Sequence, residues 1–317
     1  MKRLLVTGVS GLLGLNLAWT AGDRFHVTGV MRGERAVPLP GRTPFVTILA
    51  DLTQPGEVER VVEAAQPDAI IHCAALTNVD RCEHVLEEAE LANAWLPGRL
   101  AAASRRSGVK LVQISTDAVF DGLRGGYTEE DQPNPINAYA RSKLQGERAV
   151  ADADPDALIA RVNFYGWSWQ GRRSLSEWFF LNLSAGRRVY GFTDLHFCPL
   201  LVNDMTEILL RMLERDLSGI YHIVSGECLS KFVFGRLLAR AFGLDENLIS
   251  PASYRTAGME APRSSLLSLR CDKLVRALGE EMPAQEIAMQ RYADLYFQGY
   301  PQALRSVFVE PDHSLAG

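Results

Sequence analysis

The chain has 317 residues and a formal net charge of −5, with 33 Lys and Arg against 38 Asp and Glu. Hydrophobic residues make up 47% and charged residues 22%, a balance that excludes a disordered or fibrous chain. The basic residues are scattered, which argues against a nucleic-acid partner, and no stretch reaches the roughly 18 apolar residues of a membrane span. We therefore expect a cytoplasmic globular protein of about two lobes that binds neither nucleic acid nor membrane.

Apolar runs that predict strands alternate with helical segments through the first half of the chain. In chain order we expect strand 4–7, helix 12–21, strands 25–30 and 46–50, helix 55–65, strand 69–72, helix 80–104, strand 110–115, helix 137–150 and strand 158–162. Continuous apolar strands separated by helices are typical of a parallel sheet that helices cover on both faces. Because crossover connections between parallel strands are right-handed, such a sheet is expected to form a Rossmann-type, doubly wound α/β fold.

The alternation of predicted strands and helices becomes less regular after about residue 164, where the segments are shorter and Gly, Pro and aromatic residues are frequent. Helices are predicted at 204–214, 231–242 and 284–296, a strand at 220–224 and a loose tail at 309–317. We therefore expect a dinucleotide-binding domain over residues 1–164 and a smaller mixed α/β substrate-binding lobe over residues 165–317. Some segments of the second part are expected to return to the first domain.

The five cysteines are Cys73, Cys82, Cys198, Cys228 and Cys271. Their number is odd, no C-x-x-C motif occurs, and no histidine is interleaved at the spacing of zinc ligands. We therefore expect buried free thiols in a reducing compartment, and no metal site.

A glycine-rich turn joins the first predicted strand to the first predicted helix, with the sequence Thr7-Gly8-Val9-Ser10-Gly11-Leu12-Leu13-Gly14. A pyrophosphate can rest on the amide groups of a helix N-terminus only where no Cβ intervenes, and the helix dipole attracts it. Three glycines could alternatively serve a tight turn alone, but the position between strand and helix favours a cofactor. The predicted cofactor-binding residues of this turn are Gly8, Ser10, Gly11, Leu12, Leu13 and Gly14.

The residues after the second strand bear on the choice between NADPH and NADH. NAD-binding chains usually carry an acidic residue there, which binds the ribose hydroxyls. Here the stretch is Val30-Met31-Arg32-Gly33-Glu34-Arg35, without an aspartate at the strand end. Because guanidinium groups suit a 2′-phosphate, Arg32 and Arg35 favour NADPH, while Glu34 keeps NADH open.

A second set of chemistry-bearing residues comprises Thr116, Tyr139 and Lys143. Tyr139 and Lys143 are four positions apart, which places them on one face of a predicted helix. A phenol has a pKa of about 10, and we expect the lysine cation one turn away to lower it. Thr116 ends a central strand, at the edge where open α/β sheets bind ligands, and can hydrogen-bond a substrate oxygen. A Tyr–Lys pair alone could be exposed and solvated, but its combination with the glycine turn favours a catalytic set.

These motifs together resemble the extended short-chain dehydrogenase/reductases. The segment Ser115-Thr116-Asp117-Ala118-Val119-Phe120-Asp121-Gly122, with Asn134-Pro135 and Tyr139 to Glu147 after it, is similar to the dTDP-4-dehydrorhamnose reductase branch. The resemblance runs from residue 1 to about 280. It implies that the nicotinamide gives a hydride to a carbonyl carbon while Tyr139 supplies the proton. Lys143 would lower the pKa of the phenol and hold the nicotinamide ribose, and Thr116 would orient the carbonyl.

The resemblance also implies roles for residues further along the chain. Asp51 and Leu52 would flank the adenine, and Ala74 and Ala75 would line the cofactor path. Asn93 would belong to the cofactor site and brace the active-site strands from its helix. Each has a simpler alternative, since Asp51 could cap a helix, the alanines could allow close packing and Asn93 could lie on the surface.

The reaction cannot be chosen from the fold, because the same scaffold hosts reductases, epimerases and dehydratases. Sugar-nucleotide dehydratases of this superfamily carry Thr-Asp-Glu after the fifth strand, and here the third place is Ala118. Loss of a general acid–base group costs roughly 10²–10⁴-fold in rate, which disfavours elimination. The leading prediction is an NAD(P)H-dependent reductase of a carbonyl, with NADPH as the preferred cofactor and a 4-keto-6-deoxy sugar nucleotide as the expected substrate. The alternatives are a sugar-nucleotide epimerase or dehydratase, and a non-catalytic NADP-binding regulatory subunit like that of methionine adenosyltransferase.

Substrate contacts are expected where the smaller lobe meets the sheet. Trp167 could stack on a base or sugar, or else pack between the lobes. Arg161, Arg172 and Arg173 could pair with a diphosphate, or each could be solvated at the surface. A small-molecule keto substrate is the expected partner, and a homodimer is left open. The predicted substrate-binding residues are Thr116, Asp117, Asn163, Trp167 and Arg263.

Overall fold

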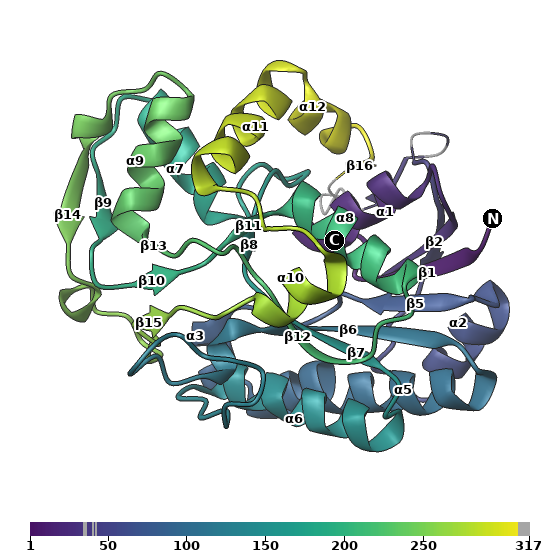
Figure 1. Ribbon diagram of the computed structural model, residues 1–317. Coiled ribbons are helices and arrows are strands. Elements are labelled where there is room, and N and C mark those ends of the chain that lie inside the picture. Colours follow the sequence, from purple (N-terminus) through teal and green to yellow (C-terminus); the bar gives the residue numbers. More distant parts are fainter. Residues whose placement is uncertain (34–36, 40, 42, 310–317) are drawn as a thin grey trace, which may run out of the picture.

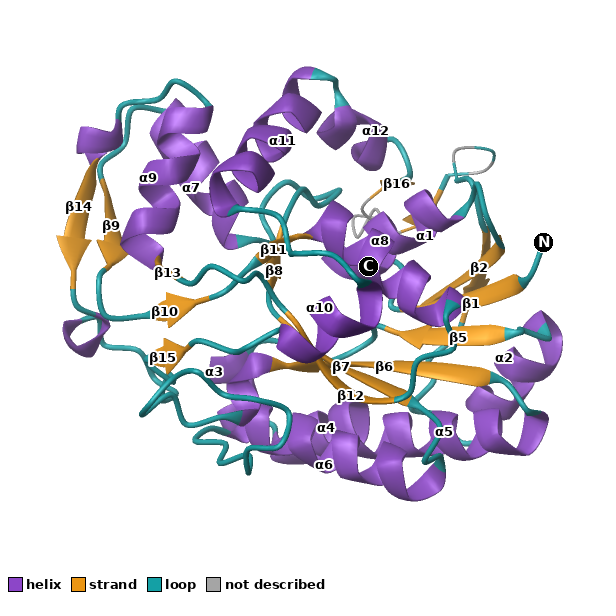
Figure 2. Cartoon of the chain, in the orientation of Figure 1, coloured by secondary structure: helices purple, strands orange, loops and turns teal. Residues whose placement is uncertain are grey.

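A sheet of seven parallel strands forms the centre of the computed structural model, which describes residues 1–33, 37–39, 41 and 43–309 (Figures 1 and 2). Across the sheet the order is β12 (Gly219–Ile223), β7 (Leu158–Val162), β6 (Lys110–Thr116), β5 (Ala69–His72), β1 (Arg3–Thr7), β2 (His26–Met31) and β4 (Val46–Leu49). From β1 the chain first adds strands on one side and then, from β5 onward, on the other. The Rossmann-type α/β fold expected from the sequence is confirmed.

Helices cover both faces of this sheet (Figure 1). On β1, Leu5 packs in the core shared with α2 (Glu57–Ala65) and α5 (Leu96–Ser107). Its neighbours Leu4 and Val6 point the other way, into the core shared with α1 (Leu12–Ala21) and α8 (Val202–Glu214). Successive side chains of a strand point to opposite faces, so a strand covered on both faces is apolar throughout.

The helix predicted over 80–104 is broken, which corrects the sequence expectation. The pieces are α3 (Val79–His84), α4 (Leu86–Glu90), a π-helical turn η1 (Leu91–Trp95) and α5. Val85 separates the first two pieces with a φ of −126° and a ψ of 59°. π-Turns within helices are frequent at functional sites, and this one carries Asn93. Helix α2 likewise begins at Glu57, after the left-handed Gly56, and not at Pro55.

The smaller lobe lies beside the large sheet, at the left of Figures 1 and 2. A three-stranded sheet has the order β13 (Leu229–Ser230), β10 (His196–Phe197), β15 (Leu266–Leu267), and β14 (Ile249–Ala252) pairs with β9 (Val189–Phe192). Helices α7 (Leu175–Ser184) and α9 (Lys231–Ala241) pack on this lobe, whereas β12 and α8 belong to the large sheet and its covering layer. The domain boundary predicted at residue 164 stays a prediction.

The remaining helices and strands complete the chain. They are β3 (Val37–Pro38), α6 (Ala138–Ala153), β8 (Phe164–Tyr165), β11 (Leu200–Leu201), α10 (Asp272–Leu278), α11 (Gln285–Phe297), α12 (Tyr300–Arg305) and β16 (Phe308–Val309), with the 3₁₀ turns η2 (Asp117–Val119), η3 (Glu246–Leu248) and η4 (Tyr254–Thr256).

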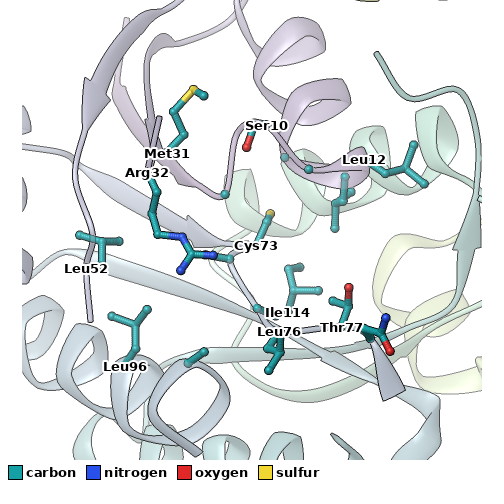
Figure 3. Close-up of a pocket in the computed structure, with 18 of the residues that line it drawn as sticks. Ser10, Leu12, Met31, Arg32, Leu52, Cys73, Leu76, Thr77, Leu96 and Ile114 are labelled. Carbon is teal, nitrogen blue, oxygen red and sulfur yellow. The ribbon is translucent and has the colours of Figure 1, made fainter. Parts of the chain in front are cut away.

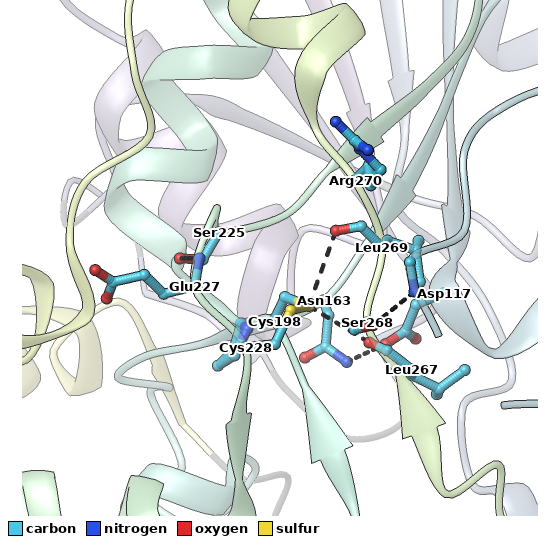
Figure 4. Close-up of a disulfide and its surroundings, with 12 residues drawn as sticks. Asp117, Asn163, Cys198, Ser225, Glu227, Cys228, Leu267, Ser268, Leu269 and Arg270 are labelled. Atoms are coloured by element: carbon cyan, nitrogen blue, oxygen red, sulfur yellow. Dashed lines mark hydrogen bonds between the residues drawn. A yellow bond between two sulfur atoms is a disulfide. The ribbon is translucent and has the colours of Figure 1, made fainter. Parts of the chain in front are cut away.

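Cys198 and Cys228 form a disulfide in the smaller lobe, whereas the sequence predicts free thiols (Figure 4). β10 pairs antiparallel with β13, with His196 opposite Ser230 and Phe197 opposite Leu229. One further step of this register places Cys198 opposite Cys228, and their Cα atoms lie 4.1 Å apart. The separation of 30 residues hides this pairing from any short motif. Cys73, Cys82 and Cys271 are free.

Over the described ranges, no helix combines the length and the apolar character that a membrane crossing needs. The tail predicted to be loose falls outside the described residues, apart from Val309 in β16.

Candidate active site

A cavity of about 760 Å³ opens at the carboxyl ends of the parallel strands (Figure 3). It lies where the strand order changes direction, between β1 and β5, which is the usual ligand site of an open α/β sheet. Most of the residues predicted to bind cofactor or to act in catalysis line it. They are Gly8, Ser10, Gly11, Leu12, Leu13, Gly14, Arg32, Asp51, Leu52, Ala74, Ala75, Thr116, Tyr139 and Lys143.

The glycine turn leaves no room for side chains. Gly8 has a φ of 68°, and a Cβ built on it would lie 2.7 Å from the amide nitrogen of Ala74. A Cβ on Gly14 would lie 2.3 Å from the carbonyl oxygen of Gly8. Gly11 caps α1 without a side chain, so the first amide groups of that helix stay available to a ligand. The turn therefore fits a dinucleotide pyrophosphate, and the indole nitrogen of Trp169 steadies it by donating to the Ser10 carbonyl at 3.0 Å.

Arg32 and Asp51 stand at the ends of neighbouring strands on the adenosine side of the cavity. Arg32 is exposed, and its side chain is drawn along the cavity in Figure 3. Burial acts to raise the pKa of Asp51, but hydrogen bonds from Thr53 and Gln54 and the Arg32 charge outweigh it and hold that pKa below its ordinary value. Arg35 and Glu34 lie outside the described residues, so Arg32 is the described cation that bears on the predicted NADPH preference.

Thr116, Tyr139 and Lys143 come together in the wall of this cavity. Tyr139 and Lys143 share a face of α6, whose first turn is capped by the Asn137 side chain. The ammonium of Lys143 donates to the carbonyl of Ile114 at 2.6 Å, and Thr116 ends the same strand, β6.

The pKa values in this set differ from the sequence expectation. Burial raises the pKa of Tyr139 to about 12, against a hydrogen bond with Thr116. Burial also lowers the pKa of Lys143 to about 8, against the attraction of Glu147. In the free protein the pKa of Tyr139 therefore rises and does not fall as predicted, because burial outweighs the Thr116 hydrogen bond and the Lys143 ammonium is bonded to the Ile114 carbonyl. Tyr139 is a protonated acid at neutral pH and can donate.

Glu147 continues the face of Tyr139 and Lys143 by one more turn of α6. It forms a buried ion pair with Arg161 at 2.8 Å and accepts a hydrogen bond from Ser115 at 2.5 Å. Arg161 is 2% exposed, so the structure corrects the suggestion that it meets a substrate diphosphate. The group ties α6 to β6 and β7, and thus sets the height of the catalytic residues over the strand ends.

Asn93 lies behind the cavity wall and does not line it. Its side-chain nitrogen donates to the carbonyl of Leu76 at 2.9 Å and to the hydroxyl of Ser142 at 3.0 Å. Its oxygen accepts from the amide of Leu76 at 2.9 Å. These bonds brace the segment after β5 against α6, in agreement with the bracing role predicted for Asn93, while its place in the cofactor site stays a prediction.

The predicted substrate residues divide into two groups. Asp117 and Asn163 are bonded to each other at 2.5 Å beside Thr116, and burial raises the pKa of Asp117 to about 6 against its hydrogen bonds (Figure 4). Arg263 pairs with Asp80 at 2.9 Å on the smaller-lobe side. Trp167 is 2% exposed and stacks on Tyr292 with ring centroids 4.3 Å apart, so its predicted substrate contact is wrong. Helix α11, which carries Tyr292, covers it.

Sequence reasoning missed Phe164, Ser174 and Leu175, which also line the cavity, whereas Arg173 beside them was named as a candidate diphosphate contact. The fully buried carboxylate of Glu177 holds the segment 173–175 by accepting from the amides of Ser168, Arg173 and Ser174 at 2.7, 2.7 and 3.0 Å. The spacing Ser174-x-x-Glu177 is a capping box, which predicts a helix start and could have revealed the loop before it.

This fold and site define an extended short-chain dehydrogenase/reductase. Residues 1–297 match the family described as RmlD substrate binding domain, and the chain belongs to that family.

Three relatives and one solved structure are similar to the chain over most of its length. The chain is 33% identical over 287 residues to the probable low-salt glycan biosynthesis reductase Agl14 of Haloferax volcanii, covering 89% of this chain and 94% of that protein. It is 32% identical to the dTDP-4-dehydrorhamnose reductase of Mycobacterium tuberculosis, covering 84% of each chain. The beta subunit of methionine adenosyltransferase 2 from Danio rerio is 31% identical, covering 86% of this chain and 84% of that one. The dTDP-4-dehydrorhamnose reductase of Bacillus anthracis in complex with NADP superimposes with a TM-score of 0.82 at 27% identity, covering 92% of this chain and 98% of that one.

Proposed function

We propose that the protein is an NADPH-dependent reductase that converts the ketone of a 4-keto-6-deoxy sugar nucleotide to an alcohol. The observation that carries this proposal is the placement of Thr116, Tyr139 and Lys143 in one wall of the cavity that the glycine turn opens. The family and the names of the two reductase relatives support the same substrate class.

The described residues fit a dinucleotide, because the positions of Gly8 and Gly14 exclude the side chains that would block it. The amide groups at the start of α1 would hold the pyrophosphate, Asp51 and Leu52 the adenosine, and Arg32 the 2′-phosphate. When bound, the cofactor supplies a hydride to the carbonyl carbon. Lys143 would hold the nicotinamide ribose.

The catalytic residues of the chain then deliver a proton to the oxygen of the carbonyl. Thr116 donates a hydrogen bond to the substrate oxygen and fixes its direction. Tyr139, protonated at neutral pH, gives its proton to that oxygen as negative charge develops on it. The ammonium of Lys143, one turn away on α6, favours the phenolate that remains.

The regulatory alternative has one observation in its favour, the similarity to a methionine adenosyltransferase beta subunit. It offers no reason for Thr116, Tyr139 and Lys143 to share one cavity wall. Elimination of water is disfavoured, because Ala118 stands at the position where sugar-nucleotide dehydratases carry an acidic residue. We therefore place reduction first.

The test follows the nicotinamide absorbance of NADPH with the purified chain and a dTDP-4-keto-6-deoxy sugar. We expect stoichiometric NADPH oxidation and an alcohol product by mass spectrometry. No oxidation with any keto sugar, together with co-purification of a methionine adenosyltransferase, would favour the regulatory role. A homodimer, a cytoplasmic location and the lack of a nucleic-acid partner remain predictions, and light scattering of the purified chain tests the first.

A further inference from the structure

The disulfide between Cys198 and Cys228 lies where the chain passes between the smaller lobe and the large sheet (Figures 1 and 4). Cys198 stands in the segment 198–201, between β10 of the smaller lobe and α8, which covers the large sheet. Cys228 stands in the segment 224–228, between β12 of the large sheet and β13 of the smaller lobe. The bond therefore fastens these two crossing segments to each other, at the place where a hinge between the lobes would bend.

The crossing segment that carries Cys198 also supports the catalytic wall of the cavity. The amide of Leu200 donates to the carbonyl of Asn163 at 2.9 Å. The side chain of Asn163 donates to one oxygen of Asp117, and the hydroxyl of Thr116 donates to the other at 3.1 Å. A line of hydrogen bonds thus connects the disulfide segment with Thr116, which orients the substrate carbonyl in the proposed function.

The two sulfur atoms differ in their access to solvent. Cys228 is exposed, whereas Cys198 is 1% exposed, so an attacking thiolate can reach the bond at the Cys228 sulfur. The carbonyl oxygens of Leu267 and Leu269 lie 3.5 and 4.0 Å from the Cys198 sulfur, where they can accept a hydrogen bond from its thiol (Figure 4). The surroundings of Cys198 therefore accommodate both the disulfide and the thiol.

Gln285 ties the same two segments together without a covalent bond. Its side-chain nitrogen donates to the carbonyl of Pro199 at 2.7 Å and to that of Glu227 at 3.3 Å, which are the neighbours of the two cysteines. Gln285 is 2% exposed, so solvent does not compete for these bonds. Breaking the disulfide would therefore loosen the crossing segments without separating them.

We propose that Cys198 and Cys228 form a redox switch that loosens the crossing segments on reduction and so lowers the affinity for the keto substrate. The thiolate of a dithiol reductant attacks the Cys228 sulfur, the disulfide breaks, and the Cys198 sulfur leaves with the electron pair and takes a proton. The second thiol of the reductant then releases Cys228 as a thiol. The protein gains two electrons and two protons, and the dithiol is oxidised to a disulfide.

The proposal rests on the proposed function, because it treats the keto substrate as the ligand whose binding changes. In the oxidised protein the wall of Thr116 is held before the substrate arrives, whereas the reduced protein must order it on binding. Ordering of that kind weakens affinity roughly 2- to 10-fold, so the KM for the keto substrate should be higher after reduction. NADPH affinity should stay the same, because the glycine turn and Lys143 lie on elements of the large sheet and its helices.

The test uses buffers of reduced and oxidised dithiothreitol to set the state of the full chain. Mass spectrometry after alkylation in denaturant should count five free thiols in the reduced protein and three in the oxidised one, on Cys73, Cys82 and Cys271. The KM for a dTDP-4-keto-6-deoxy sugar and the Kd for NADPH are then measured in both states. Cys228→Ser should show the KM of the reduced protein in every buffer, whereas the matched control Cys271→Ser should keep the redox dependence.

Amide hydrogen exchange gives a readout that needs no turnover. The crossing segments 198–201 and 224–228 should exchange faster in the reduced protein. Five thiols that persist in oxidising buffer, equal exchange rates in the two states, or equal KM values in the two states would each overturn the proposal. Redox-dependent exchange in a protein that oxidises no NADPH would refute the reductase and support the switch in the crossing segments.

Discussion

Glu147→Gln separates the electrostatic role of Glu147 from its role in packing. Glu147 is 3% exposed, and its carboxylate pairs with the guanidinium of Arg161, which is 2% exposed. Removing one partner of a buried ion pair leaves an uncompensated charge and costs about 3–5 kcal/mol. Because glutamine keeps an acceptor for Arg161, we expect the lower end of that range, which corresponds to a fall in Tm of about 6–10 °C.

The same change should move the pH profile of the reaction. The Glu147 charge raises the pKa of Lys143 against burial, which leaves that pKa at about 8 in the wild type. Activity that needs the Lys143 ammonium is present below this pKa and is lost as the pH rises through it. Without the carboxylate the pKa falls further, so the alkaline limb of kcat should shift to lower pH.

The assays are thermal unfolding and a pH series of NADPH oxidation. Asp272→Asn is the matched control, since it breaks the exposed pair with Arg270 and should change neither measurement noticeably. A Glu147→Gln protein with wild-type Tm, or with an unmoved alkaline limb, would refute the reasoning.

Three further predictions follow from individual contacts. Gly14→Ala should lower NADPH affinity at least about 10-fold in a fluorescence titration, because its Cβ would meet the Gly8 carbonyl at 2.3 Å and overpacking costs about 1–3 kcal/mol; unchanged affinity would count against the glycine cradle. Arg32→Glu should exchange a cation for an anion beside the 2′-phosphate and favour NADH in the ratio of kcat/KM values, whereas a retained NADPH preference would assign that role elsewhere. Reduction of the Cys198–Cys228 disulfide, which spans 30 residues, should lower the free energy of unfolding by about 3–4 kcal/mol in denaturant titrations, with Cys271→Ser as the control, and equal stability in both redox states would contradict it.

The parts of the fold predicted well are those that depend on local pattern. Strands β5 and β7 begin and end where the sequence predicts, because a strand buried on both faces is apolar along its whole length. The glycine turn and the Tyr139–Lys143 spacing are likewise local, and the structure brings both to one cavity.

The parts predicted badly depend on contacts between distant segments. The break in the helix around η1 accompanies the bonds of Asn93 to Leu76 and Ser142, neither of which lies near it in the sequence. The burial of Trp167 comes from Tyr292 on a helix more than a hundred residues later. The pKa of Tyr139 was expected to fall because only its neighbour on the helix was considered, while burial raises it.

The most direct test of the account is single-turnover reduction by Tyr139→Phe with bound NADPH and a dTDP-4-keto-6-deoxy sugar. Loss of the general acid should slow the chemical step roughly 10²–10⁴-fold, while NADPH affinity stays at the wild-type value. A Tyr139→Phe protein that binds NADPH normally and reduces the ketone at the wild-type rate would contradict the assignment of Tyr139 as the proton donor.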